Sequence, residues 1–262
     1  MKIRANGIDI EYRVEGDSGP WVTLSHSLAC NNGMWDAQID ALTKRYHVLR
    51  YDTRGHGATT ATPPPYTLGQ LAEDALALLD ALHIERTHWV GLSLGGMIGE
   101  PFALEHADRL HSLVLCDTTS RYPREAAATW DERIRNAEAT GMAGLADATL
   151  ARWFTAPYRE RHPDIMKQFA AAIAATPLAG YAGCGRAIAT IDLTERLREV
   201  RVPTLVIVGE QDTGTPVAMA REIADAIPGA RLTVLASAAH LSNVEQADRF
   251  NEAVLGFLGE VR

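Results

Sequence analysis

The stretch Val90-Gly91-Leu92-Ser93-Leu94-Gly95-Gly96 decides the fold of this chain. It holds the pattern G-x-S-x-G, which follows the apolar run 87–90 and precedes a helical stretch that starts near Met97. A serine between a strand and a helix in this pattern is typical of a nucleophile elbow. The glycines on either side lack a Cβ, so the backbone can turn sharply there and pass close to neighbouring segments. The alternative is a plain Gly/Ser-rich turn, and the rest of the chain has to decide.

Composition limits the possible functions. The chain has 262 residues, of which 47% are apolar, enough for one large domain or for a core with a substantial insertion. Its net charge of −8 argues against a nucleic-acid partner, because phosphate binding needs a basic patch. Cys30, Cys116 and Cys184 are odd in number and widely spaced, which fits neither a disulfide framework nor paired metal ligands. We therefore expect no metal and no cofactor.

The N-terminus indicates where the protein works. Residues 1–7 carry charge but no apolar stretch follows them, so we expect no signal peptide. No apolar run is long enough to span a bilayer. We expect a cytoplasmic protein with no membrane partner; the sequence gives no indication of its oligomeric state.

Strand and helix patterns alternate over most of the chain. Apolar or alternating runs predict strands at 8–14, 21–24, 46–52, 87–90, 113–117, 202–209 and 231–235, with helical periodicity between most of them. Thr67 and Gln70 have capping-box spacing ahead of one such helix. This alternation predicts a mostly parallel, twisted sheet flanked by helices, whose active site lies outside the carboxyl ends of the strands.

The pattern changes between about 118 and 197. Strand signals vanish, and alanine-rich helical stretches occupy 126–140, 145–154, 164–175 and 181–191. We expect a core formed by 1–120 and 198–262, with a helical cap at 121–197 that roofs the site. The alternative is a structural appendage, which the insertion point after a strand end makes less attractive.

A serine hydroxyl needs a base to take its proton and an acid to orient that base. Among the nine histidines, His26, His56 and His240 lie on loops that follow strands. For the acid, Asp212 leaves a strand, and so do its rivals Asp52 and Asp117. The order Ser93, Asp212, His240 is the nucleophile–acid–histidine order of α/β-hydrolases.

An oxyanion hole would complete the site. One backbone N–H comes from the residue after the nucleophile, Leu94, and a second from the loop after an early strand. Leu28, in His26-Ser27-Leu28, is the candidate for the second donor.

The sequence resembles the α/β-hydrolase superfamily over its whole length, and within it the 3-oxoadipate enol-lactonase family. The segments that carry the resemblance are 49–57, 91–96, 152–155, 180–184 and 240–245. The resemblance implies the triad Ser93, Asp212 and His240, and a cap that closes over a small lactone carrying a carboxylate. The chain departs from the family where His26 and Ala29 replace the usual asparagine and glycine of the oxyanion loop; His26 there is expected to organise the loop by a hydrogen bond.

A carboxylate on the substrate would need a cationic partner, and arginine suits it best. The cap supplies Arg121, Arg124, Arg133, Arg135, Arg152 and Arg186. We single out Arg133, because Trp130 precedes it by one helical turn and the two share a face. Alternatively, Arg133 is an exposed residue paired with a neighbouring acid, and Trp130 packs cap to core.

Other functions remain open on the sequence alone. They are a general carboxylesterase or lactonase on neutral esters, a non-hydrolytic ligand-binding protein of this fold, and a lyase or cofactor-free perhydrolase. A dehalogenase is disfavoured, because the elbow carries serine where that chemistry needs a carboxylate.

Overall fold

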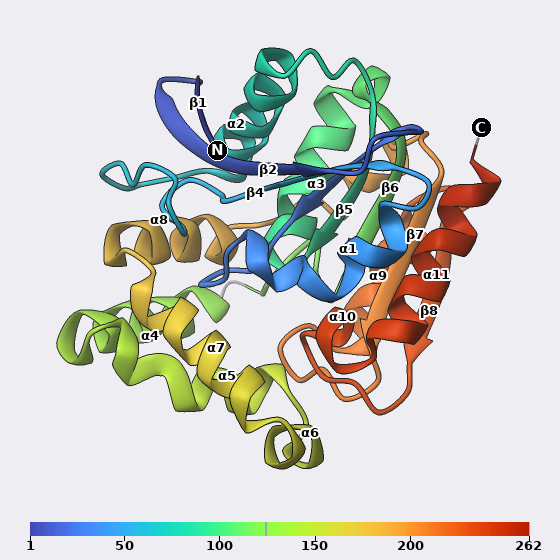
Figure 1. Cartoon of the computed structure of the whole chain (residues 1–262). Coiled ribbons are helices and arrows are strands. Elements are labelled where there is room, and N and C mark those ends of the chain that lie inside the picture. Colours follow the sequence, from blue (N-terminus) through green and yellow to red (C-terminus); the bar gives the residue numbers. More distant parts are fainter. Residues whose placement is uncertain (124, 262) are drawn as a thin grey trace.

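The computed structural model describes residues 1–123 and 125–261. Within them, eight strands form one sheet in the order β1-β2-β4-β3-β5-β6-β7-β8. Strands β4, β3, β5, β6, β7 and β8 run parallel to one another. At one edge of the sheet, β2 is antiparallel to both of its neighbours, β1 and β4 (Figure 1). The strands are β1 (Lys2–Ala5), β2 (Ile8–Glu15), β3 (Trp21–Ser25), β4 (His47–Tyr51), β5 (Thr87–Leu92), β6 (Leu110–Cys116), β7 (Thr204–Gly209) and β8 (Arg231–Leu235).

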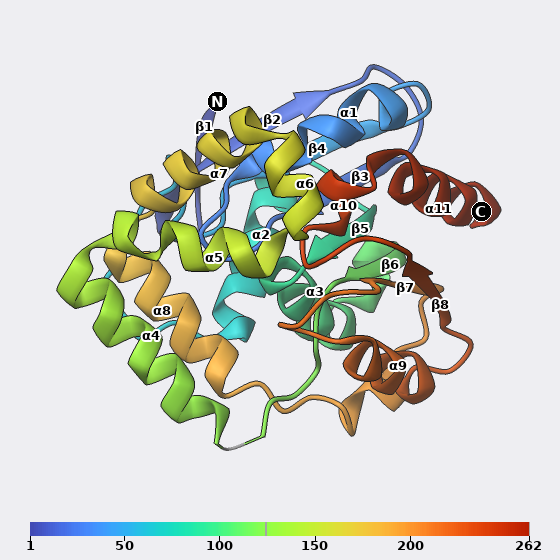
Figure 2. The same ribbon diagram turned by 90° about the horizontal axis from the view of Figure 1, so that it is seen from below.

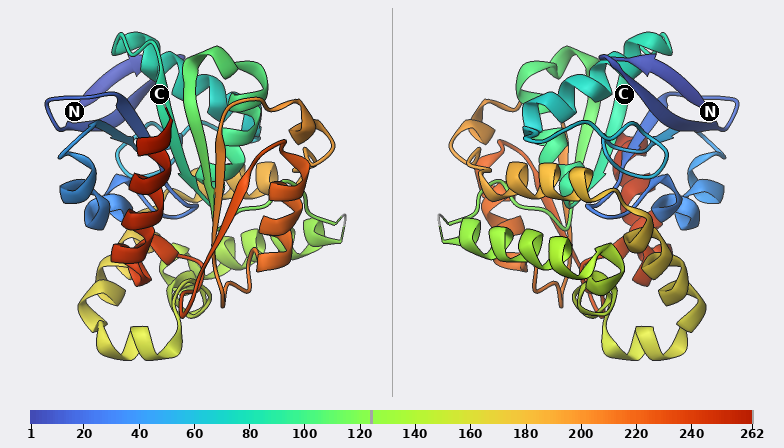
Figure 3. Two further views of the ribbon diagram at one scale, coloured as in Figure 1. Left: turned by 90° about the vertical axis from the view of Figure 1, so that its right-hand side faces the viewer. Right: turned by 90° about the vertical axis from the view of Figure 1, so that its left-hand side faces the viewer.

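Helices cover both faces of the sheet, as the alternation predicts. Helices α1 and α11 contact each other on one face, while α2, α3 and α9 lie on the other (Figure 3). The helices of this part are α1 (Asp36–Leu42), α2 (Leu68–Ala81), α3 (Leu94–Glu105), α9 (Val217–Ala226), α10 (Ser242–Glu245) and α11 (Ala247–Glu260). Thr67 caps α2, since its hydroxyl accepts the Gln70 N–H at 3.0 Å.

Five further helices form a separate layer, which lies at the lower end of the molecule in Figure 3 and is seen from beneath in Figure 2. They are α4 (Ala126–Thr140), α5 (Ala146–Trp153), α6 (Ala156–Arg161), α7 (Pro163–Ala175) and α8 (Leu178–Ala189). The layer is held together by contacts of α4 with α8 and of α5 with α7. Arg124, one of the arginines considered above, lies outside the described residues.

The sequence analysis missed several short elements, among them β1 and α6. Strand β1 is only four residues long and pairs with β2 across the turn Asn6-Gly7, where both residues have positive φ. An Asn-Gly dipeptide is the usual signal for such a hairpin. Helix α6 has six residues and begins beside Pro157, which is compatible with the first turn of a helix.

No helix of the described chain is both long and apolar enough to cross a membrane.

Helix α3 is buried along most of its length, because β3, β5 and β6 lie on one side and α2 on the other. Its Glu100 is fully buried, and neither carboxyl oxygen has a hydrogen-bond partner among the described residues. Burial raises the pKa of Glu100 well above its ordinary value, because the ionised form is deprived of water.

We expect Glu100→Gln to stabilise the protein at neutral pH. The unfolded chain ionises Glu100 above about pH 4.5 whereas the folded chain resists ionisation, so wild-type stability falls as pH rises above that value. The gain at pH 7.5 should be at least about 1.4 kcal/mol, the equivalent of one unit of pKa shift, and should vanish near pH 4, where both side chains are neutral. Thermal unfolding across this pH range measures it, with the exposed Glu105→Gln as control. An equal gain at both pH values would contradict the explanation.

Candidate active site

Ser93 occupies a sharp turn between β5 and α3. Its φ of 54° and ψ of −112° are unusual for a residue with a side chain, and such strain costs about 1–3 kcal/mol. Glycine is required around it: a Cβ on Gly91 would lie 2.1 Å from the Gly95 carbonyl oxygen, and one on Gly95 would lie 2.0 Å from that of Ser25. The Ser93 N–H donates to the Cys116 carbonyl at 2.8 Å. The turn therefore has the geometry that the G-x-S-x-G pattern predicts.

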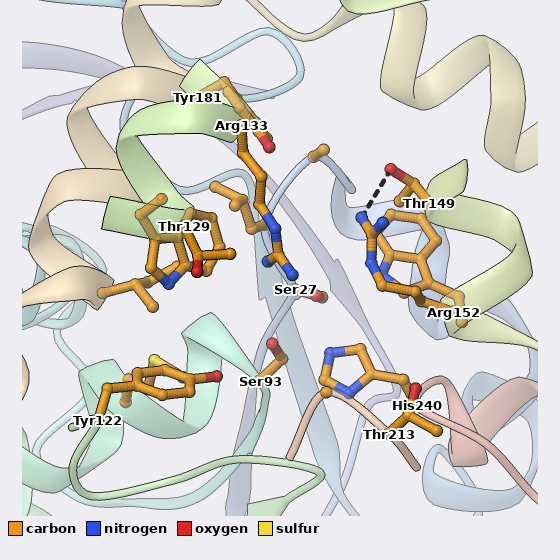
Figure 4. Close-up of a pocket in the computed structure, with 17 residues that line it drawn as sticks. Ser27, Ser93, Tyr122, Thr129, Arg133, Thr149, Arg152, Tyr181, Thr213 and His240 are labelled. Carbon is orange, nitrogen blue, oxygen red and sulfur yellow. Dashed lines mark hydrogen bonds between the residues drawn. The ribbon is translucent and has the colours of Figure 1, made fainter. Parts of the chain in front are cut away.

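Asp212 and His240 are brought together from the loops after β7 and β8. Nδ1 of His240 lies 2.8 Å from Oδ2 of Asp212. The same carboxylate accepts the N–H of Gly214 at 2.7 Å, and both the N–H and the hydroxyl of Thr215 at 3.1 and 2.7 Å. Because a carboxylate that accepts this many hydrogen bonds keeps its ionised form, Nδ1 of His240 carries the proton and Nε2 is free. The side chains of Ser93 and His240 lie beside each other at the base of the cavity (Figure 4).

The pKa values of this pair move in opposite directions. Burial disfavours both charged forms, but the interaction between the two groups outweighs it. The pKa of Asp212 is held below its ordinary value by the charge and hydrogen bond of His240 and by the hydrogen bonds of Thr215. The pKa of His240 is raised by the charge and hydrogen bond of Asp212 and by the charge of Asp117, while the Arg152 cation opposes the rise.

The rival acids have other partners. Asp117, after β6, accepts the Gly209 N–H at 2.7 Å and the Ser242 hydroxyl at 2.5 Å, and burial together with the charge of Asp212 raises its pKa well above its ordinary value. Asp52, after β4, accepts the N–H groups of Asn32 and Ala58 at 2.7 and 2.9 Å. Neither carboxylate is hydrogen-bonded to His240, so Asp212 alone of the three has the position that an orienting acid needs.

The rival histidines lie behind the cavity. His26 and His56 are fully buried, and their ring centroids are 5.3 Å apart. Burial lowers the pKa of His26 to about 4 and that of His56 to about 3, so both rings are neutral at physiological pH. Neither side chain lines the cavity above Ser93.

Two backbone N–H groups lie where an oxyanion hole is expected. Strand β3 pairs with β5 so that Ser25 is opposite Gly91, which brings the loop after β3 beside the elbow. Leu28 of that loop lines the cavity, and Leu94 is the first residue of α3. Within the described chain, neither the Leu28 N–H nor the Leu94 N–H has a hydrogen-bond acceptor. Two free donors near the serine hydroxyl suit a developing negative charge.

A cavity of about 200 Å³ lies between these groups and the helical layer. Its wall includes Trp130 and Arg133 from α4, Arg152 from α5 and Tyr181 from α8. No carboxylate is among the residues that line it. Lining residues that the sequence analysis did not single out include Tyr122, Thr149 and Thr213.

The two arginines face the cavity from different helices (Figure 4). The guanidinium carbon of Arg133 lies 4.8 Å from the centroid of the Trp130 ring, so the two side chains share a face of α4, as their spacing predicts. Arg152 donates to the Thr149 hydroxyl at 3.2 Å. Burial and the charge of Arg133 lower the pKa of Arg152. In the described structure neither guanidinium forms an ion pair, so the neighbouring Asp131 and Glu132 do not neutralise Arg133.

The remaining arginines of the helical layer point elsewhere. Arg121 pairs with Glu222 on the surface, and Arg135 and Arg186 are exposed. Trp130 also contacts α8, where a Cβ on Gly185 would lie 3.3 Å from its ring. The sequence analysis did not single out Arg152, because the residue it faces, Arg133, lies on another helix and no spacing along the chain relates the two. Among the described residues, no group of three or more His, Cys, Asp or Glu side chains is arranged to hold a metal ion.

Comparison with known proteins agrees with this geometry. Residues 20–247 match the model of the alpha/beta hydrolase fold family. The chain is 34% identical over 253 residues to 3-oxoadipate enol-lactonase 2 of Acinetobacter baylyi, covering 96% of this chain and 94% of that protein.

Solved structures give the same result. An enol-lactonase from Burkholderia xenovorans LB400 superposes with a TM-score of 0.95 at 42% identity, covering 99% of this chain and all of that one. A thermophilic esterase from Thermogutta terrifontis, solved with malate bound, superposes with a TM-score of 0.93 at 28% identity, covering all of this chain and 98% of the other. The fold class predicted from the sequence is thereby confirmed, and the chain belongs to the α/β-hydrolase fold family.

Proposed function

We propose that this protein is a serine hydrolase that opens a small enol-lactone bearing a carboxylate, of the 3-oxoadipate enol-lactone type. The observation that carries the proposal is the pair Arg133 and Arg152, which face the cavity above Ser93 and His240 with no carboxylate among the lining residues. Half-buried cations without a partner favour a counter-ion, and a substrate carboxylate would supply it. The similarity to the two enol-lactonases supports this substrate.

Each residue of the triad has a role in this mechanism. His240 takes the Ser93 proton through Nε2, and the Ser93 oxygen attacks the lactone carbonyl. The Leu28 and Leu94 N–H groups stabilise the oxyanion, and collapse of the tetrahedral intermediate opens the ring to leave an acyl-enzyme. The enolate oxygen that leaves takes the proton from His240. Water, activated in turn by His240, then releases the second carboxylate and restores Ser93. Asp212 keeps the imidazole oriented throughout.

The helical layer completes the proposal. We propose that 121–197 form a cap whose helices α4, α5 and α8 exclude water and hold the substrate, with Trp130 as an apolar wall and Arg133 and Arg152 as anion-binding groups. The small volume favours a compact lactone over a long acyl chain. The cytoplasmic location stays a prediction.

A general carboxylesterase is the second candidate. It would use the same triad, and the similarity to the Thermogutta esterase favours it. The cavity distinguishes the two functions, because a neutral ester gains nothing from two unpaired arginines.

Asp212→Asn should lower kcat by about 10³- to 10⁴-fold without unfolding the protein, because the amide misorients His240. Wild-type kcat/KM should rise with pH through a midpoint above 6.5, since only neutral imidazole accepts the proton and the pKa of His240 is raised. Asp117→Asn is the matched control. It should keep most of kcat and shift the midpoint downward, as one of the charges that raise the pKa of His240 is removed. The opposite ranking of the two variants would make Asp117 the orienting acid.

Arg133→Ala and Arg152→Ala should each weaken kcat/KM for the carboxylated enol-lactone by about ten- to hundredfold, the equivalent of a hydrogen bond to a charged group. The methyl ester of the same lactone should be a poorer wild-type substrate and should barely respond to either change. Arg135→Ala, exposed on the same helix as Arg133, is the control. Equal losses on acid and ester would show that the arginines are structural, and no loss on either would favour the general esterase.

A further inference from the structure

Tyr122 lines the cavity beside Ser93, and the mechanism described above does not use it. It follows β6, in the segment that enters the helical layer, and lies outside the segments that carry the resemblance to the enol-lactonase family. Its hydroxyl points toward the centre of the cavity (Figure 4). Among the described residues, no side chain or backbone group is hydrogen-bonded to this hydroxyl.

The backbone holds Tyr122 in place. The Tyr122 N–H donates to the Ile191 carbonyl at 3.2 Å, and the preceding residue, Arg121, pairs with Asp192 in an antiparallel bridge. The segment that enters the helical layer therefore lies against the segment that leaves it. The side chain of Arg121 also forms an ion pair with Glu222 of α9. The Tyr122 ring thus enters the cavity from a fixed point.

The phenol of Tyr122 is neutral and able to donate. Burial and the charge of Asp212 raise the pKa of Tyr122 to about 12, against the opposing charge of Arg133. The hydroxyl therefore keeps its proton over the pH range in which His240 titrates. A phenol that faces a cavity needs an acceptor. Since no carboxylate lines this cavity, the acceptor comes from water or from a bound molecule.

The order of the strands decides which part of an ester Tyr122 faces. The loop with Leu28 follows β3, Ser93 follows β5 and Tyr122 follows β6, and these three strands are neighbours in the sheet in that order. Tyr122 therefore lies across Ser93 from the oxyanion loop. In Figure 4, Ser93 also lies between Tyr122 and His240.

A carbonyl carbon bonded to Ser93 has three other substituents. Its oxygen turns toward the N–H groups of Leu28 and Leu94, and the leaving oxygen takes its proton from His240. The acyl chain takes the remaining side. Tyr122 is the residue with an unpaired hydroxyl on that side.

A lactone differs from an open ester at this point, because its leaving oxygen stays attached to the acyl chain. In an enol-lactone of the 3-oxoadipate type, the ring oxygen is bonded to the γ-carbon of that chain. Ring opening therefore produces an acyl-enzyme with an enol, and then a ketone, at the γ-carbon. Water can reach His240 only after this oxygen has moved away from the imidazole. A donor on the other side of Ser93 offers the oxygen a hydrogen bond there and favours the open chain.

We propose that Tyr122 is a specificity-determining residue whose hydroxyl donates a hydrogen bond to an oxygen on the γ-carbon of the acyl chain. The inference rests on the proposed function and deepens it, because it assigns a partner to a part of the substrate that the two arginines do not bind. It predicts that acyl groups with a γ-ketone are favoured over the same groups without one, even when the leaving group is a simple phenol.

Two p-nitrophenyl esters test the proposal. The levulinate ester has a γ-ketone, and the valerate ester has a chain of the same length without it. For each ester kcat/KM is measured, with spontaneous hydrolysis subtracted, on the wild type, Tyr122→Phe and Tyr181→Phe, together with the Tm of each protein. Tyr122→Phe removes only the hydroxyl. It should lower the ratio of levulinate to valerate kcat/KM by about three- to tenfold, the equivalent of a hydrogen bond between neutral groups.

Tyr181→Phe is the matched control. Tyr181 lines the same cavity, but the charges of both Arg133 and Arg152 act on its hydroxyl, which places it on the side of the arginines. Loss of this hydroxyl should change the two esters by the same factor and leave their ratio as in the wild type.

An unchanged ratio in Tyr122→Phe, or the same change of ratio in Tyr181→Phe, would overturn the proposal. So would equal losses on both esters that follow a fall in Tm, because Tyr122 would then only support packing. The enol-lactone itself is tested separately on the wild type. A protein that shows the expected ratios but leaves the enol-lactone intact would contradict the proposed substrate while supporting the role of Tyr122.

Discussion

The close approach of three backbone segments around Ser93 is the constraint on which the rest of the structure depends. Gly91, Gly95 and the end of β3 are in contact at distances that leave no room for a Cβ on either glycine. This contact places the loop after β3 beside the first turn of α3, and so puts two free N–H groups next to one hydroxyl. The strain at Ser93 is offset by the burial of β5 and α3, which pack against each other in the core.

The polar groups around the elbow form two systems with different electrostatics. In front of the serine, Asp212 and His240 are hydrogen-bonded to each other, and each favours the charged form of the other. Behind it, the neutral ring of His26 lies between the Thr53 N–H and the Ser27 carbonyl. The helical layer is connected to the first system, since the Leu241 N–H donates to the Trp153 carbonyl at 3.0 Å and Glu245 accepts the Thr155 N–H at 3.2 Å. These two hydrogen bonds link the loop of His240 to the wall that carries Arg152.

Much of this was predictable from the sequence, for reasons that can be named. The spacing of apolar residues shows which side of each strand and helix is buried, and the alternation of the two predicted the parallel sheet. The chain order Ser93, Asp212, His240 selected three residues that the structure brings together. Contacts between segments that are distant in the chain produce no such pattern in the sequence. The approach of Gly55 to Gly180, whose Cα would lie 2.4 Å from a Cβ on Gly55, and the facing of Arg152 toward Arg133 depend on how the helices dock. Short elements such as β1 and α6 have too few residues for a period.

Labelling with a fluorophosphonate tests the central claim, that Ser93 is the nucleophile of a lactone-opening enzyme, most directly. Peptide mapping by mass spectrometry should find one phosphonyl group per chain, on Ser93, with hydrolysis of the carboxylated enol-lactone lost in proportion to labelling. The ring-opened dicarboxylate, which would occupy the same cavity, should slow the labelling of the wild type. A protein whose Ser93 is fully labelled and which still opens the lactone would contradict the account, as would loss of activity through modification of another residue.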